Sequence, residues 1–118
     1  MIHSYNEWDQ LEEIVVGIAD HANWPVNDPV YRKEAENSLW TETAAPQGPV
    51  PQWIIDEANE DLDALAQVCQ EYGATVHRPQ PYDYVKRKGM YGYCPRDRVL
   101  VAGKKIVDVS MMYPCRNQ

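Results

Sequence analysis

The sequence predicts a single α/β domain, residues 1–118, in which one main helix packs on a small mixed sheet. Short β-branched segments lie on either side of an apolar stripe with helical spacing at residues 51–72. Near the carboxyl end, a glycine-containing turn joins two more apolar segments, as in a β-hairpin. With 118 residues, 44% of them hydrophobic, the chain is long enough for one domain with a modest core.

The first predicted strand covers residues 11–17, a β-branched run closed by Gly17. Residues 20–50 follow as an irregular loop rich in proline and tryptophan, and loops of this length inside compact domains are usually functional or partly ordered. A short helix near residues 31–39 interrupts this loop in our prediction.

The main helix begins at Pro51 and ends before Gly73, which is suited to a left-handed helix stop. A second strand is predicted at residues 74–77. The hairpin pairs residues 98–102 with 105–109 around Gly103 and Lys104, and both of its faces are apolar. Because one helix covers one side of a small sheet, we expect the bare side to be covered by self-association or by a partner domain.

Composition excludes several classes of function. The net charge of −7 is divided unevenly, with 15 acidic and 2 basic residues up to Glu71 and 3 acidic and 9 basic residues after it. The overall acidity would repel a nucleic-acid backbone, and no apolar run predicts a signal peptide or membrane span. Three cysteines without metal-ligand spacing favour reduced thiols in a cytoplasm, with no disulfide framework, metal or organic cofactor.

Asp97, in the Pro-Arg-Asp sequence at residues 95–97, is the main candidate site residue. A carboxylate held there after a proline-stiffened approach suits a planar cation such as guanidinium. The alternative is a structural aspartate neutralised by Arg96 and Arg98. Cys94 also has two interpretations, a small buried side chain or a thiol whose pKa the same arginines lower toward a nucleophilic thiolate.

Several segments resemble the glycine amidinotransferase family, in the family's order and over nearly the whole chain. These segments are Ser4, Tyr5, Asn6, Glu7, Trp8 and Asp9; Leu11, Glu12, Glu13, Val15, Val16 and Gly17; Gly73, Ala74, Thr75, Val76, Arg78 and Pro79; Met90, Tyr91, Pro95, Arg96 and Asp97; and Val101, Gly103, Ile106, Val107, Met111 and Arg116.

The resemblance implies a module of the pentein fold, a ring of small α/β units around a channel for a guanidino substrate. In that family a cysteine thiolate attacks the guanidinium carbon, a histidine moves protons, and the amidino group passes to an amine. Asp97 matches a substrate-gripping aspartate, and Arg116 is the second expected substrate-binding residue. Residues matching the family's catalytic cysteine and histidine are not identified here, so we assign no catalytic residue.

We therefore expect an amino-terminal, truncated amidinotransferase-like module that is catalytically incomplete alone, so its classification as an enzyme is left open. The alternative is a freestanding, self-associating module that binds a guanidino or other cationic small molecule. The expected partners are such a small molecule and other copies of the chain, and neither nucleic acid nor a membrane.

Overall fold

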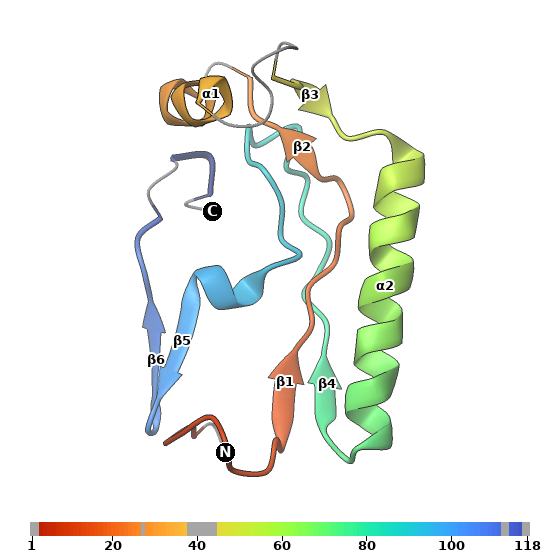
Figure 1. Ribbon diagram of the computed structural model, residues 1–118, viewed down its shortest axis with the longest axis vertical. Helices are drawn as coiled ribbons and strands as arrows, with labels where there is room; N and C mark the ends of the chain where they lie inside the picture. Colours follow the sequence, from red (N-terminus) through yellow and green to blue (C-terminus); the bar gives the residue numbers. More distant parts are fainter. Residues whose placement is uncertain (1–2, 27, 38–44, 112–113, 117–118) are drawn as a thin grey trace.

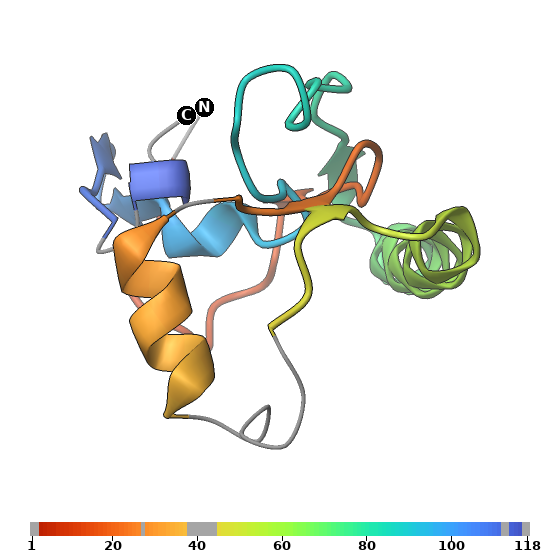
Figure 2. The same cartoon turned by 90° about the horizontal axis from the view of Figure 1, so that it is seen from above.

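The computed structural model describes residues 3–26, 28–37, 45–111 and 114–116 (Figure 1). The molecule is elongated, with principal extents of 44 × 29 × 27 Å. Helix α2 (Gln52–Glu71) lies along one side and the β5–β6 hairpin along the opposite side, with strands β1 and β4 between them (Figures 1 and 2). No helix in these described ranges is long and apolar enough to cross a membrane.

The strands form three two-stranded sheets instead of one continuous small sheet. The pairs are β1 (Glu13–Val15) with β4 (Thr75–His77) in parallel, β2 (Asn23–Trp24) with β3 (Gly48–Pro49) antiparallel, and β5 (Val99–Ala102) with β6 (Lys105–Asp108) antiparallel. A bridge between Ser4 and Gly103 connects the amino-terminal segment to the hairpin turn.

Helix α2 confirms the predicted main helix. Pro51 is its N-cap residue, and Gly73 follows its end with a φ of +88°, the left-handed conformation that glycine adopts without a steric penalty. The helix packs against β4. Its buried residues are Ile55, which is 6% exposed, and Ala66, and Ala58 and Leu62 pack against the core cluster around Ile55.

The proline- and tryptophan-rich segment contains more regular structure than the sequence predicts. Helix α1 (Pro29–Glu36) lies close to the predicted short helix, and it starts there because the Asp28 side chain accepts hydrogen bonds from the main-chain N–H groups of Val30 and Tyr31. The β2–β3 pair then brings the two ends of the segment together. Residues 38–44, the end of the predicted helix included, lie outside the described residues.

The core is small and lies between the start of α2 and the segment after β1. Ala19, Ala22 and Ile55 form its buried centre, and Tyr91 packs against it. The accessible surface of the chain is 8840 Å², whereas a compact folded monomer of this mass exposes about 6,600 Å². Part of this exposed surface is apolar, because Trp8, Trp53 and Tyr72 are each more than 60% exposed.

The β5–β6 hairpin has the predicted turn and register, and it provides part of this exposed apolar surface. Leu100 pairs with Val107 and Val101 pairs with Ile106, so apolar side chains occupy both faces. Leu100 is 56% exposed and Ile106 is 54% exposed. The expectation that this chain by itself leaves apolar faces uncovered is confirmed. That another copy or a partner domain covers these faces stays a prediction.

Candidate guanidinium site

The segment that carries the candidate site passes the carboxyl end of β1. Gly17 makes this passage possible, because a methyl group on its Cα would overlap the main chain of Tyr93. The start of the segment is tied to β2 by Asn23, which is 5% exposed. Its side-chain amide donates to the Gly89 carbonyl at 2.8 Å, and its main-chain N–H donates to the Met90 carbonyl at 2.7 Å. The segment is thus fixed before it reaches Asp97.

The structure brings the two predicted site residues together. The Arg116 Nη2 atom lies 2.7 Å from Asp97 Oδ2, and the guanidinium carbon lies 4.5 Å from the centre of the Tyr91 ring. The Arg116 side chain is 11% exposed and the Asp97 side chain 37%. A carboxylate in the plane of a guanidinium and an aromatic ring over its face are the two contacts that a planar cation favours.

Electrostatics agree with this geometry. Burial lowers the pKa of the Arg116 guanidinium, but the hydrogen bond to Asp97 and the electrostatic interactions with Tyr91, Asp97 and Cys94 together outweigh it. The net shift is upward, so Arg116 is charged. Burial also raises the pKa of Tyr91, with a further contribution from Tyr93, which stacks on it at 4.2 Å between ring centres. Tyr91 therefore presents a neutral ring to the cation.

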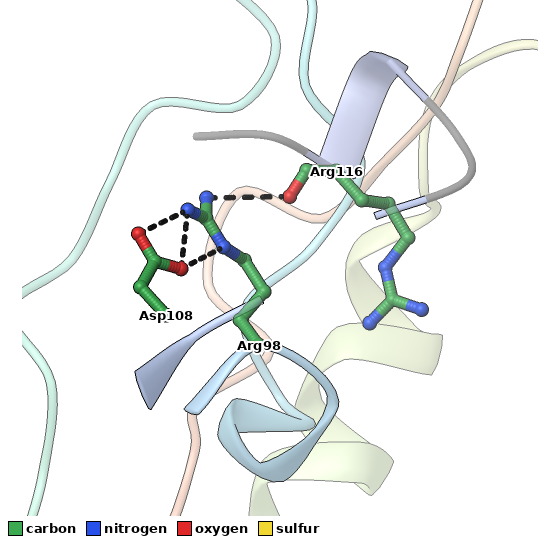
Figure 3. Close-up of polar contacts among 3 residues, drawn as sticks. All are labelled: Arg98, Asp108 and Arg116. Carbon is green, nitrogen blue, oxygen red and sulfur yellow. Dashed lines mark hydrogen bonds and ion pairs between the residues drawn. The ribbon is translucent and has the colours of Figure 1, made fainter. Parts of the chain in front are cut away.

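The main chain of Arg116 is held by a second arginine (Figure 3). Arg98 forms a forked ion pair with Asp108, with Nη2 lying 2.8 Å from Oδ1 and 3.0 Å from Oδ2. Its Nη1 donates to the Arg116 carbonyl at 3.4 Å. The hairpin thus supports the residue whose side chain reaches Asp97.

The alternative interpretation of Asp97, a carboxylate neutralised by Arg96 and Arg98, names the wrong cations. Asp97 ends the short 3-10 helix η1 (Pro95–Asp97), and its ion-pair partner is Arg116, 19 residues along the chain, whereas Arg98 pairs with Asp108. The neutralising cation is a distant residue instead of the neighbouring arginines. Sequence reasoning missed Tyr91 as the ring beneath Arg116, because a contact between residues so far apart leaves no local pattern.

Cys94, the candidate nucleophile, does not have the electrostatic environment that the sequence suggested. Burial, followed by the nearby Asp97 carboxylate, raises the pKa of Cys94, and these effects outweigh Arg116 and Arg96. Of the two interpretations of Cys94, the arginine-activated thiolate is therefore contradicted and the structural side chain is favoured, although Cys94 is only partly buried. Among the described residues, no group of three or more histidine, cysteine or acidic side chains is arranged to hold a metal ion, and Cys69, Cys94 and Cys115 are free thiols.

Comparison with known proteins gives consistent matches. No protein-family model matches the chain. The chain is 33% identical over 120 residues to inosamine-phosphate amidinotransferase 1 from Streptomyces griseus, covering 94% of this chain and 35% of the relative. It is 33% identical over 122 residues to mitochondrial glycine amidinotransferase from Xenopus tropicalis, covering 96% and 29%. It is also 33% identical over 125 residues to L-arginine:L-lysine amidinotransferase from Pseudomonas savastanoi pv. phaseolicola, covering 96% and 34%.

The fold gives the same result. The solved structure of the Streptomyces griseus inosamine-phosphate amidinotransferase matches with a TM-score of 0.80 at 30% sequence identity, covering 98% of this chain and 36% of that one. The predicted α/β module with a carboxyl-terminal hairpin is therefore confirmed as part of the amidinotransferase, or pentein, fold. The chain spans about a third of the length of the curated relatives it matches. By sequence and by fold, the chain belongs to the amidinotransferase family over the part of its members that it spans.

Proposed function

We propose that this chain supplies the guanidinium-holding part of an amidinotransferase-type site, with Asp97 as the carboxylate that binds the cation. One observation carries the proposal: Asp97 already holds a guanidinium, that of Arg116, at 2.7 Å and over an aromatic ring. Arg116 engages one carboxylate oxygen, and the Asp97 side chain is 37% exposed. An external guanidinium therefore has access to the carboxylate.

Arg116 is the second proposed ligand-binding residue. A guanidinium has five N–H donors, and the contact with Asp97 uses Nη2. The remaining donors suit an anionic group on the same ligand. An arginine-like ligand has both groups, a guanidinium for Asp97 and a carboxylate for Arg116. One of the relatives, the L-arginine:L-lysine amidinotransferase, is named after such a compound, and this supports the same substrate class here.

We infer that the chain alone binds such a ligand without transferring its amidino group at an appreciable rate. The reaction requires a thiolate nucleophile, and the pKa of Cys94, the cysteine nearest Asp97 in sequence, is raised instead of lowered. Transfer of the amidino group from arginine to glycine or another amine by the purified chain would contradict this part of the proposal.

The binding test is an NMR titration of the chain with L-arginine. We expect a dissociation constant of about 1 mM or weaker, because a single partly solvated ion pair contributes little. Asp97→Asn should abolish saturable shifts. Asp63→Asn is the matched control, because Asp63 also pairs with an arginine, Arg78, at 2.7 Å but lies on the outer surface of α2. Equal binding by the Asp97→Asn and Asp63→Asn variants, or no saturable shift in the parent chain, would contradict the proposal.

A second candidate function is a self-associating binding module, and the surface area favours it. The chain exposes about 2,200 Å² more than a compact monomer of its mass, and an obligate dimer buries about 1,000–2,500 Å² on each partner. We propose that copies of the chain cover one another's exposed hairpins. Sedimentation velocity decides this: a concentration-dependent dimer or larger assembly supports it, and a monomer at 100 μM contradicts it.

A further inference from the structure

Asp28 connects two parts of the molecule that are far apart in sequence. It is 8% exposed, and its two carboxylate oxygens have different partners. Oδ1 accepts hydrogen bonds from the main-chain N–H groups of Val30 and Tyr31, both at 3.0 Å, and so caps helix α1. Oδ2 accepts from the main-chain N–H of Cys115 at 3.2 Å, 87 residues along the chain.

The second contact is not required for capping. One side-chain oxygen is enough to cap a helix, and serine or asparagine does so about as well as aspartate. Burial raises the pKa of the Asp28 carboxyl, but the hydrogen bonds from Tyr31, Cys115 and Val30 together outweigh it and the net shift is downward. The buried side chain is therefore ionised, and its second oxygen has a role at Cys115.

Cys115 is the residue before Arg116, and it is itself 6% exposed. Both lie in the short 3-10 helix η2 (Pro114–Arg116). The main chain here is held from two directions, by Asp28 at the Cys115 N–H and by Arg98 at the Arg116 carbonyl. A fixed main chain lowers the conformational entropy that the long Arg116 side chain loses when it reaches Asp97.

We propose that Asp28 is a positioning residue for the guanidinium site: through the bond from the Cys115 N–H to its Oδ2, it fixes the main chain from which Arg116 reaches Asp97 and Tyr91. Asp28 does not contact the ligand. An effect of Asp28 on ligand affinity rests on the proposed function, whereas its effect on the position of Arg116 does not.

Two substitutions separate the capping role from the positioning role. Asp28→Asn keeps an oxygen for α1 but presents an amide group to the Cys115 N–H, so that two donors face each other. Asp28→Ser caps the helix through a shorter side chain that does not extend to Cys115. Asp83→Asn is the matched control, because the Asp83 side chain also accepts a main-chain N–H, that of Lys86 at 2.8 Å, without a link to Arg116.

The ligand-free readouts are amide hydrogen exchange and the ring-current shift that Tyr91 imposes on the Arg116 side chain. In both Asp28 variants we expect exchange at the Cys115 amide to accelerate about tenfold, and the Arg116 shift to move toward its random-coil value. Exchange at the Tyr31 amide should change less than about twofold, since the cap remains. The Asp83→Asn control should match the parent chain at all three positions.

The ligand readout is the L-arginine titration, in which we expect affinity to fall about three- to tenfold in both Asp28 variants. If Cys115 exchange and the Arg116 shift stay unchanged in both folded variants, the positioning role is wrong even if arginine binds. If both readouts change while the parent chain fails to bind arginine, the positioning role stands and the proposed function fails.

Discussion

Helix α2 and the β5–β6 hairpin are both regular elements that local sequence specifies, but they are stabilised in different ways. The helix inserts Ile55 into the core and ends at a left-handed glycine. The hairpin exposes apolar side chains on both faces, and ion pairs with hydrogen bonds connect it to its surroundings. The comparison teaches that burial stabilises the helix side of this molecule, whereas the hairpin side combines polar contacts with apolar side chains that stay exposed.

The largest expected difference between the two halves comes from the same substitution made in each. Ile55→Ala removes a buried side chain and should lower the free energy of unfolding by about 3 kcal/mol. Ile106→Ala changes a side chain that is 54% exposed in the hairpin and should cost about 0.5 kcal/mol or less. Urea unfolding measures both. Equal losses would show that the hairpin is as buried as the helix in solution.

Gly17→Ala tests the close approach between the segment after β1 and the segment that leads to Asp97. A methyl group there would overlap the Tyr93 main chain, so we expect a loss of about 2 kcal/mol and a displaced site segment. The control is Gly48→Ala, whose added carbon meets no atom within 4 Å but whose φ of +88° costs about 1 kcal/mol. Tyr93 and Arg116 resonances should move in the first variant and remain in place in the second. Unmoved resonances in Gly17→Ala would contradict the close approach.

Two arginine–aspartate pairs allow a finer comparison. Arg98→Lys loses the forked contact with Asp108 and the bond to the Arg116 carbonyl, whereas Arg78→Lys alters the pair with Asp63 on α2. Each should cost about 1 kcal/mol or less, because both aspartates are largely exposed. Arg98→Lys should shift the Arg116 side-chain resonances, and Arg78→Lys should not. If the Arg116 resonances are the same in both variants, Arg98 does not hold Arg116 in place.

The smallest effect is a dependence of stability on pH in the β1–β4 pair. A hydrogen bond with His77, at 2.8 Å, lowers the pKa of Glu13 from its ordinary value of 4.5. A lowered pKa in the folded state means that the stabilising contribution is complete above pH 4.5 and is lost as the pH falls through the folded value.

Urea unfolding of the parent chain and of Glu13→Gln should therefore differ slightly above pH 4.5, and the difference should shrink as the pH falls through the folded-state pKa of Glu13. Glu60→Gln on α2 is the control for the loss of one negative charge. A Glu13→Gln difference that does not shrink as the pH is lowered below 4.5 would contradict the assignment.

Local signals in the sequence were sufficient to predict the long helix and the hairpin. Pro51 and Gly73 bound the long helix, and Gly103 marks the hairpin turn, because each acts on its own main chain. The pairing of β2 with β3 and the bond from Cys115 to Asp28 join distant residues, so no local pattern encodes them. For the candidate site, the Pro-Arg-Asp segment pointed to Asp97 as a prediction, whereas its contact with Arg116, and that of Arg116 with Tyr91, required the folded chain.

A crystal structure of the chain with guanidinium or L-arginine bound tests the central claim, that the hairpin half carries a guanidinium site, most directly. We predict a planar cation within hydrogen-bond distance of the Asp97 carboxylate, either beside Arg116 or in place of its side chain. A saturating ligand bound elsewhere, with the Asp97–Arg116 pair unchanged and no added density at the carboxylate, would contradict the account.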